Sequence, residues 1–424
     1  MEIKGIKEFI RGKAFSSYVL TFGIEFLIMA ISVALFKIVA IKFEDLGFAE
    51  FTINKRLVGF LMPLMMMGMG VSLPKFLPNE NQEKQAEIHY SALIIVTSLF
   101  LFFLIVFLSM SNQLSKLAFG DYQHKKMCVA TLLYVYSLMV HACLYNYFRG
   151  KFKFNISSLL QLINLGVFPL ITYFFAGNIF QYFIILSSST LIFLVLVNWM
   201  FIPIIRISIS NYLSTIKRIV KYGIQRMPGD VVLGLFLLIP TSIATNYFSI
   251  IIGGNIALCL SLFNIVIALM SPVNIILLPK ASKIVHEKKF THLRDISSKL
   301  LFLSLAVGII AFLGVYLFGD HILILFGVKN HEEATAYLNI IFLAIIGYSL
   351  FSVIRSIIDA YYEKARVTSI IVISFSLFLL IVGILKYLDL FTIKSILIAF
   401  ALSINVLGLL TYFSLIRIYI KIRK

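Results

Sequence analysis

The residues best suited to carry chemistry in this sequence are ionisable side chains inside long apolar segments. Glu25 lies within the first segment, and Lys37 follows it by about 18 Å if that segment is a helix. Lys55 and Arg56 lie in the next segment. A charged group in hydrocarbon is costly unless it faces a cavity or a partner, so all of these residues are candidates for binding a charged ligand. The basic residues would attract an anion, and Glu25 would bind a coupling proton or sodium ion.

The alternative for each basic residue is snorkelling, in which a long side chain reaches the headgroups at the membrane surface. Glu25 could likewise be a carboxylate that is paired within a helix bundle. The loops on that side of the predicted helices are otherwise poor in positive charge. The cluster therefore favours a cationic, substrate-binding cavity formed by Lys37, Lys55 and Arg56.

Two pairs of opposite charge are spaced i, i+4 in the second half of the chain. Arg226 and Asp230 flank a Pro-Gly pair, and Arg355 and Asp359 lie near the end of a later apolar segment. Residues at this spacing share one face of a helix, so each pair can form an ion pair. We expect structural ion pairs at the inner, cytoplasmic gate of the molecule.

Histidine and cysteine give no pattern of a metal site or of nucleophilic catalysis. The 7 histidines include no HExxH motif, and His141, deep in an apolar segment, is expected to be a packed polar residue. The 3 cysteines lie in apolar segments and are expected to be small buried side chains. We therefore expect no enzyme, no catalytic residue, no metal and no cofactor, with proton or sodium coupling as the open question.

The elements that must position these residues are apolar segments of about 20 residues, each long enough to cross a hydrocarbon core of about 30 Å as a helix. The chain is 60% hydrophobic and 13% charged, whereas soluble domains carry about 25% charged residues. The sequence therefore predicts an all-α integral membrane protein with about twelve transmembrane helices. We expect spans at 15–41, 51–73, 89–110, 127–148, 155–176, 179–204, 229–249, 255–278, 299–318, 335–359, 367–386 and 393–416.

The net charge of +18 is unevenly distributed along the chain. If the N-terminus is cytoplasmic, most Lys and Arg residues fall in cytoplasmic loops, as the positive-inside rule requires. Both termini are then cytoplasmic, and basic loops such as 205–225 and 280–299 face anionic membrane lipids. This distribution explains the positive charge without a nucleic-acid partner.

A short motif recurs at equivalent points of the two halves. Leu73-Pro74-Lys75 closes the second predicted span, and Leu278-Pro279-Lys280 closes the eighth. Proline cannot continue a helix, and a lysine after it faces the negative helix end and the headgroups. The repeat predicts an N-terminal six-helix lobe at 1–210 and a C-terminal six-helix lobe at 211–424, the architecture of alternating-access transporters.

Several motifs resemble those of one known family. The most specific are Tyr222 to Asp230 (YGIQRMPGD) and Leu277 to Ser282 (LLPKAS), with weaker support from Phe148-Arg149-Gly150 and from Arg355 to Ala360. They are similar to the bacterial polysaccharide (O-antigen type) flippases of the oligosaccharidyl-lipid/polysaccharide exporter family, in the MATE-like superfamily. Gln225 departs from the proline expected there, which affects the local helix entry.

The resemblance implies a MATE-like bundle in the bacterial inner membrane, with the substrate path between two lobes. It implies that the cargo is an undecaprenyl-pyrophosphate-linked oligosaccharide, as used in O-antigen and lipopolysaccharide synthesis, which is flipped from the cytoplasmic to the outer leaflet. A polysaccharide polymerase complex is the partner that the family implies. In that setting Lys37, Lys55 and Arg56 would attract the pyrophosphate.

Two other functions remain open at this point. A MATE-like cation-coupled multidrug antiporter would share the fold but would need acidic residues to hold cationic drugs. A membrane glycosyltransferase or polymerase would be expected to have a long outer loop with a catalytic acid, whereas the longest predicted outer loops, 111–126 and 319–334, are short. The basic residues of the first half favour the flippase.

Overall fold

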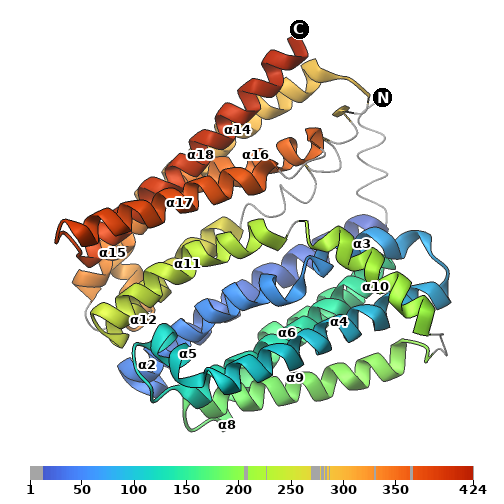
Figure 1. The fold of residues 1–424 in the computed structure, drawn as a ribbon, viewed down its shortest axis with the longest axis horizontal. Coiled ribbons are helices and arrows are strands. Elements are labelled where there is room, and N and C mark those ends of the chain that lie inside the picture. The colour runs from blue at the N-terminus through green and yellow to red at the C-terminus, as the bar shows by residue number, and fades with distance from the viewer. Residues whose placement is uncertain are drawn as a thin grey trace. The chain divides into compact units, whose positions relative to one another are not determined.

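The structure is a computed structural model that describes residues 13–204, 209–225, 227–268, 277, 281, 284–285, 287–328, 331–362 and 366–423. Every regular element in these residues is helical, which confirms the predicted all-α class (Figure 1). Within the same residues, 11 helical segments are long and apolar enough to cross a membrane. The chain is thus a multi-pass membrane protein.

The count differs from the predicted twelve because one long helix covers the first two predicted spans. Helix α2, Lys13–Met66, runs through the first span and most of the second, and its backbone leaves the helical conformation at Glu44, with φ 56° and ψ −168°. Glu44 therefore marks the turn that the sequence placed between the first and second spans.

Contacts divide the chain into two compact units, Met1–Met227 and Pro228–Lys424, each with its own core. In the first unit, α6 is the central helix, and α2, α3, α4, α7 and α9 pack against it. Phe51 of α2 is buried beside Tyr182 and Phe183 of α9, with ring centroids 5.8 and 6.2 Å away. The helices of this unit, besides α2, are α3 Met69–Phe76, α4 Gln82–Ser109, α5 Ser111–Phe119, α6 Lys125–Gly150, α7 Phe154–Leu162, α8 Phe168–Phe175, α9 Ile179–Phe201 and α10 Ile209–Gly223, with a 3₁₀ turn η1 at Leu77–Asn79 and a π-helical turn η2 at Ile163–Val167.

The second predicted span ends differently from the sequence expectation. The helix breaks at Met67 and Gly68, both at positive φ, and resumes as α3, which continues through Pro74 to Phe76. Gly68 lies so close to Gly223 that a Cβ at Gly68 would be 2.5 Å from the Gly223 carbonyl oxygen. The break therefore lies one turn after Pro63 and several residues before Pro74, where the chain comes against Gly223. The matching residues Leu278, Pro279 and Lys280 lie outside the described part of the chain.

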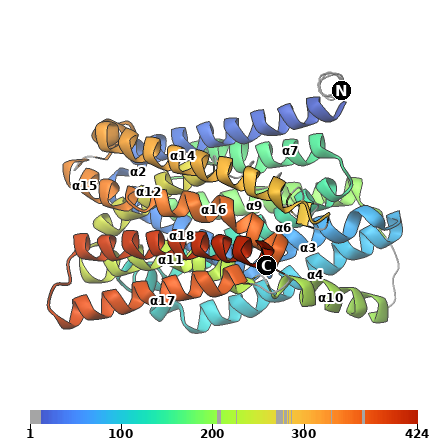
Figure 2. The same ribbon diagram turned by 90° about the horizontal axis from the view of Figure 1, so that it is seen from above.

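Helix α10 packs on α3 and α4, so it belongs to the first unit (Figures 1 and 2). Thr215 donates a hydrogen bond to the buried Glu87 carboxylate of α4 and accepts one from Lys84 at 3.2 Å. Arg218 pairs with Glu80 at 3.0 Å. The boundary between the units consequently follows α10, whereas the sequence assigned 211–223 to the second lobe.

The second unit is built around a cluster of phenylalanine rings. Phe236 of α11 contacts Phe375 of α17 and Phe400 of α18, with centroids 5.0 and 6.4 Å away. Phe263 of α12 lies 6.1 Å from Phe400. The helices of this unit are α11 Met227–Tyr247, α12 Ile250–Ala268, α14 Phe290–Leu325, α15 His331–Phe342, α16 Ile345–Tyr361, α17 Arg366–Tyr387 and α18 Ile393–Arg423.

A close helix contact holds α16 against α18. A Cβ on Gly408 would be 2.4 Å from the backbone oxygen of Gly347. Asn405 spans the break between α15 and α16: its amide donates to the Leu343 carbonyl at 3.1 Å and accepts from the Gly347 N–H at 3.1 Å. The side chain thus satisfies backbone groups that the break leaves unpaired, which lipid could not do.

Candidate functional site

Lys55 is half-buried on α2 and lies over aromatic rings of the same helix. Its Nζ is 4.5 Å from the centroid of Phe36 and 5.1 Å from that of Phe51, and both rings are buried. A cation over a ring face is attracted by the ring quadrupole, most strongly where water is excluded. The two phenylalanines come from the segments of α2 before and after Glu44, so the ammonium group is held where these segments meet.

Arg56 is half-buried next to Lys55, and the two cations repel each other. Lys37 is exposed on α2, one residue beyond Phe36. Lys55 and Arg56 are thus consecutive half-buried residues of an apolar helix, and Lys37 is at an exposed position of the preceding segment. Such a concentration of positive charge is suited to an anion.

Glu25 is exposed on α2, where its carboxylate accepts a hydrogen bond from Gln161 of α7 at 3.0 Å. The charges of Glu25 and Arg149 both act on the Tyr145 side chain of α6. The Arg149 guanidinium lies 5.4 Å from the centroid of the Tyr145 ring. Figure 2 shows α2 running beside α7. The carboxylate thus belongs to a polar group that could bind a proton or a cation.

Further polar contacts follow the same helices. Thr21 of α2 and Ser158 of α7 are 3.0 Å apart, and His141 of α6 is 3.0 Å from Asn164 of the π-helical turn η2. His141 is buried, which confirms that it is a packed polar residue. Turns of π-helix are often found at functional sites.

One guanidinium connects two carboxylates in the second unit. Arg355 Nη2 lies 3.1 Å from Asp230 Oδ1, and Arg355 Nε lies 3.6 Å from Asp359 Oδ2. The predicted pair of Arg355 and Asp359 is present. Asp230 also pairs with Arg355, and this contact joins α11 to α16. Arg226 lies outside the described residues. The three side chains form a bridge from α11 to α16, named here the Arg355 bridge.

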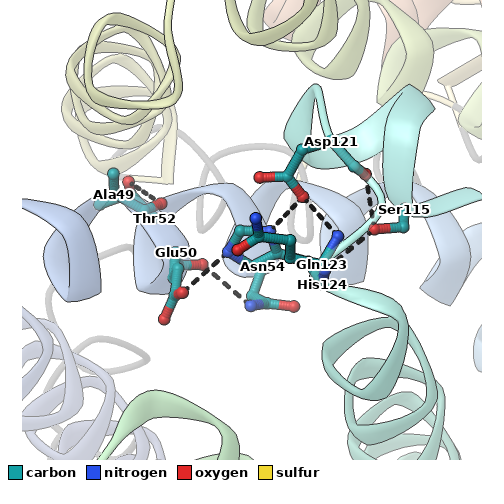
Figure 3. Close-up of polar contacts among 8 residues, drawn as sticks. All are labelled: Ala49, Glu50, Thr52, Asn54, Ser115, Asp121, Gln123 and His124. Carbon is teal, nitrogen blue, oxygen red and sulfur yellow. Dashed lines mark hydrogen bonds and ion pairs between the residues drawn. The ribbon is translucent and has the colours of Figure 1, made fainter.

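A polar network that sequence reasoning missed surrounds His124, which precedes α6 (Figure 3). His124 Nδ1 is 2.7 Å from Asp121 Oδ1, and Nε2 is 2.9 Å from Glu50 Oε1 of α2. Phe119 stacks on the imidazole with centroids 4.7 Å apart. Ser115 accepts a hydrogen bond from the His124 N–H and donates one to the Asp121 carbonyl. The network fastens the loop after α5 to α2.

Both ring nitrogens can donate to carboxylates only when the imidazole carries two protons. Burial alone would lower the pKa of His124, but the hydrogen bonds and charges of Glu50 and Asp121 outweigh it and raise that pKa above its usual 6.5. The i, i+3 spacing of Asp121 and His124 is visible in the sequence. The Glu50 contact has no local pattern, because it joins distant segments.

Comparisons with known proteins bear on this architecture. The MatE family model matches residues 254–385. An inward-facing multidrug resistance MATE family transporter of the MOP superfamily superposes with a TM-score of 0.74 at 11% identity, covering 95% of this chain and 98% of its own. The MATE multidrug transporter DinF-BH gives 0.71 at 15% identity, with 95% and 94% covered. The lipid II flippase MurJ, in an inward closed conformation, gives 0.71 at 15% identity, with 95% and 90% covered. No curated protein sequence matches the chain.

The similar structures give the chain a MATE-like transporter fold along nearly its whole length, which confirms the predicted bundle. They include multidrug transporters and a lipid flippase. The choice between these cargoes must therefore rest on the side chains.

Proposed function

We propose that this protein flips an undecaprenyl-pyrophosphate-linked oligosaccharide repeat unit from the cytoplasmic to the outer leaflet of the bacterial inner membrane by alternating access. The observation that carries the proposal is the adjacent pair Lys55 and Arg56, half-buried in an apolar helix. A pyrophosphate that enters the bilayer loses its hydration, and a preformed pair of cations replaces part of it. The sequence motifs described above and the similarity to a lipid II flippase support a lipid-linked cargo.

The remaining polar groups can be given roles in the same transport cycle. Lys37, exposed on the preceding segment of α2, would extend the positive charge along the path. Glu25 would bind the coupling proton or sodium ion, and the Arg355 bridge would stabilise the cytoplasmic gate. Both termini would be cytoplasmic, and a polysaccharide polymerase complex would receive the product.

The second candidate is a cation-coupled multidrug antiporter. It is favoured by the Glu25 carboxylate and by the structural similarity to MATE multidrug transporters. An antiporter of cationic drugs should transport its substrate better when the charges of Lys55 and Arg56 are removed, because these charges repel the substrate. A flippase should lose activity on the same change.

The first test is to deplete the protein in its host and to assay lipid-linked oligosaccharide with a sugar-modifying probe that cannot cross the membrane. Flipping predicts that the oligosaccharide accumulates on the cytoplasmic side and that re-expression restores the normal distribution. Unchanged sidedness together with increased drug sensitivity would instead identify an antiporter.

The second test uses re-expression of variants in the depleted host. Lys55→Gln combined with Arg56→Gln should abolish the restoration, because the pyrophosphate loses both cations. Lys42→Gln is the matched control, since Lys42 is an exposed lysine of α2 that contacts the Tyr173 carbonyl. If the double variant flips as well as the control, these two residues do not bind the pyrophosphate.

A further inference from the structure

A groove runs between α17 and α18 in the second unit, away from every residue assigned a role above. Its volume is about 640 Å³. Arg366, Ser369 and Ile373 line one wall from α17, and Arg417, Ser414 and Leu410 line the other from α18. On each helix the residues are spaced three or four apart, so each wall is one helix face. Figure 1 shows the two helices side by side.

The groove carries its two arginines at one end, where Ile416 and Ile420 also line it, and only apolar side chains at the other. Arg366 begins α17 and Arg417 lies in the last turns of α18, so the two guanidinium groups mark the same end of the antiparallel pair. Ser369 and Ser414 follow one turn inward, and Ile373 and Leu410 lie about 10 Å from the arginines along the helix axes. A ligand that fits this order carries an anionic head and a hydrocarbon chain.

The positive charge of the two arginines favours a ligand with an anionic headgroup. Guanidinium groups bind phosphate oxygens through paired N–H donors, and Arg417 is exposed. The positive end of the α17 dipole adds to the attraction at Arg366. A basic pocket between transmembrane helices, at the end that positive-inside counting places in the cytoplasm, is a common site for an acidic lipid headgroup.

We propose that this groove binds one anionic phospholipid, with its phosphate between Arg366 and Arg417 and an acyl chain along Ile373 and Leu410. A free phosphate ion would use only the arginines. A zwitterionic lipid would bring a cationic group to the same positively charged end. The apolar wall and the arginines together therefore select an acidic lipid.

The test is native mass spectrometry of the delipidated full-length protein in detergent, titrated with phosphatidylglycerol, with phosphatidylcholine or with inorganic phosphate. We expect one phosphatidylglycerol to bind at least about tenfold more tightly than phosphatidylcholine, since one charge-assisted hydrogen bond accounts for about that factor. Arg366→Gln combined with Arg417→Gln should remove the preference. Lys394→Gln, an exposed charge at the opposite end of α18, should leave it unchanged.

A third variant tests the acyl-chain half of the site without touching the arginines. Ile373→Trp fills the apolar end of the groove and should weaken the binding of phosphatidylglycerol while leaving the protein's charge unchanged. This variant tests the proposal even if the arginine variant fails to fold. Equal binding of both lipids in the unmodified protein would overturn the proposal. Binding of inorganic phosphate that competes fully with the lipid would reduce the site to an adventitious anion site and would also overturn it.

Discussion

Replacing His124 should destabilise the first unit, and the effect should depend on pH. The His124 side chain is 12% exposed and touches Glu50 and Asp121, which are 18% and 43% exposed. A hydrogen bond to a charged group contributes about 1.5–3 kcal/mol when buried, and solvent reduces the contribution of the more exposed Asp121. We therefore expect His124→Gln to cost about 2 kcal/mol when the imidazole is charged.

The direction of the pH dependence follows from the raised pKa of His124. A group that binds its proton more tightly in the folded state stabilises the fold fully below its unfolded pKa, which is about 6.5 for histidine. That stabilisation is lost as the pH rises through the higher, folded pKa. The cost of the substitution should accordingly be largest in mild acid and should shrink in mild alkali.

The assay is thermal unfolding of the full-length protein in detergent, for the unmodified chain and for His124→Gln, between about pH 5.5 and pH 9. A cost of about 2 kcal/mol corresponds to a Tm lowered by about 4–8 °C in a unit of about 200 residues. His292→Gln is the control, because His292 is exposed on α14 in the other unit. A Tm difference that stays constant across this range, or that grows in alkali, would refute the charged imidazole between two carboxylates.

The other predictions concern the second unit. Gly408→Ala should cost about 1–3 kcal/mol or more, because the new Cβ would be 2.4 Å from the Gly347 backbone oxygen, whereas Gly383→Ala, with no atom within 4 Å, should be neutral or stabilising in thermal unfolding. Arg355→Gln should lower stability more than Asp359→Asn, since only the former leaves both carboxylates without their shared cation. Because these side chains are partly exposed, we expect Arg355→Gln to lower the free energy of unfolding by about 1 kcal/mol. Denaturation of both variants under the same conditions measures the two losses, and a larger loss for Asp359→Asn would contradict this prediction.

The sequence by itself determined the class of the protein and the approximate positions of its membrane-spanning helices. Composition and the length of the apolar runs sufficed, because a bilayer requires long apolar helices wherever a chain crosses it. The same reasoning identified Glu25, Lys55 and Arg56 as unusual, since charge within such a run is costly. It also identified the Arg355–Asp359 pair, whose spacing is fixed by one helix.

Only the tertiary structure decided which side chains meet across helices. Glu50 reaches His124, and Asp230 reaches Arg355, because whole helices pack with a particular rotation and tilt. The spacing of residues along one helix does not determine that rotation. The packing of α10 against α3 and α4 and the close approach of Gly68 to Gly223 are likewise contacts between separate helices, which local sequence does not reveal.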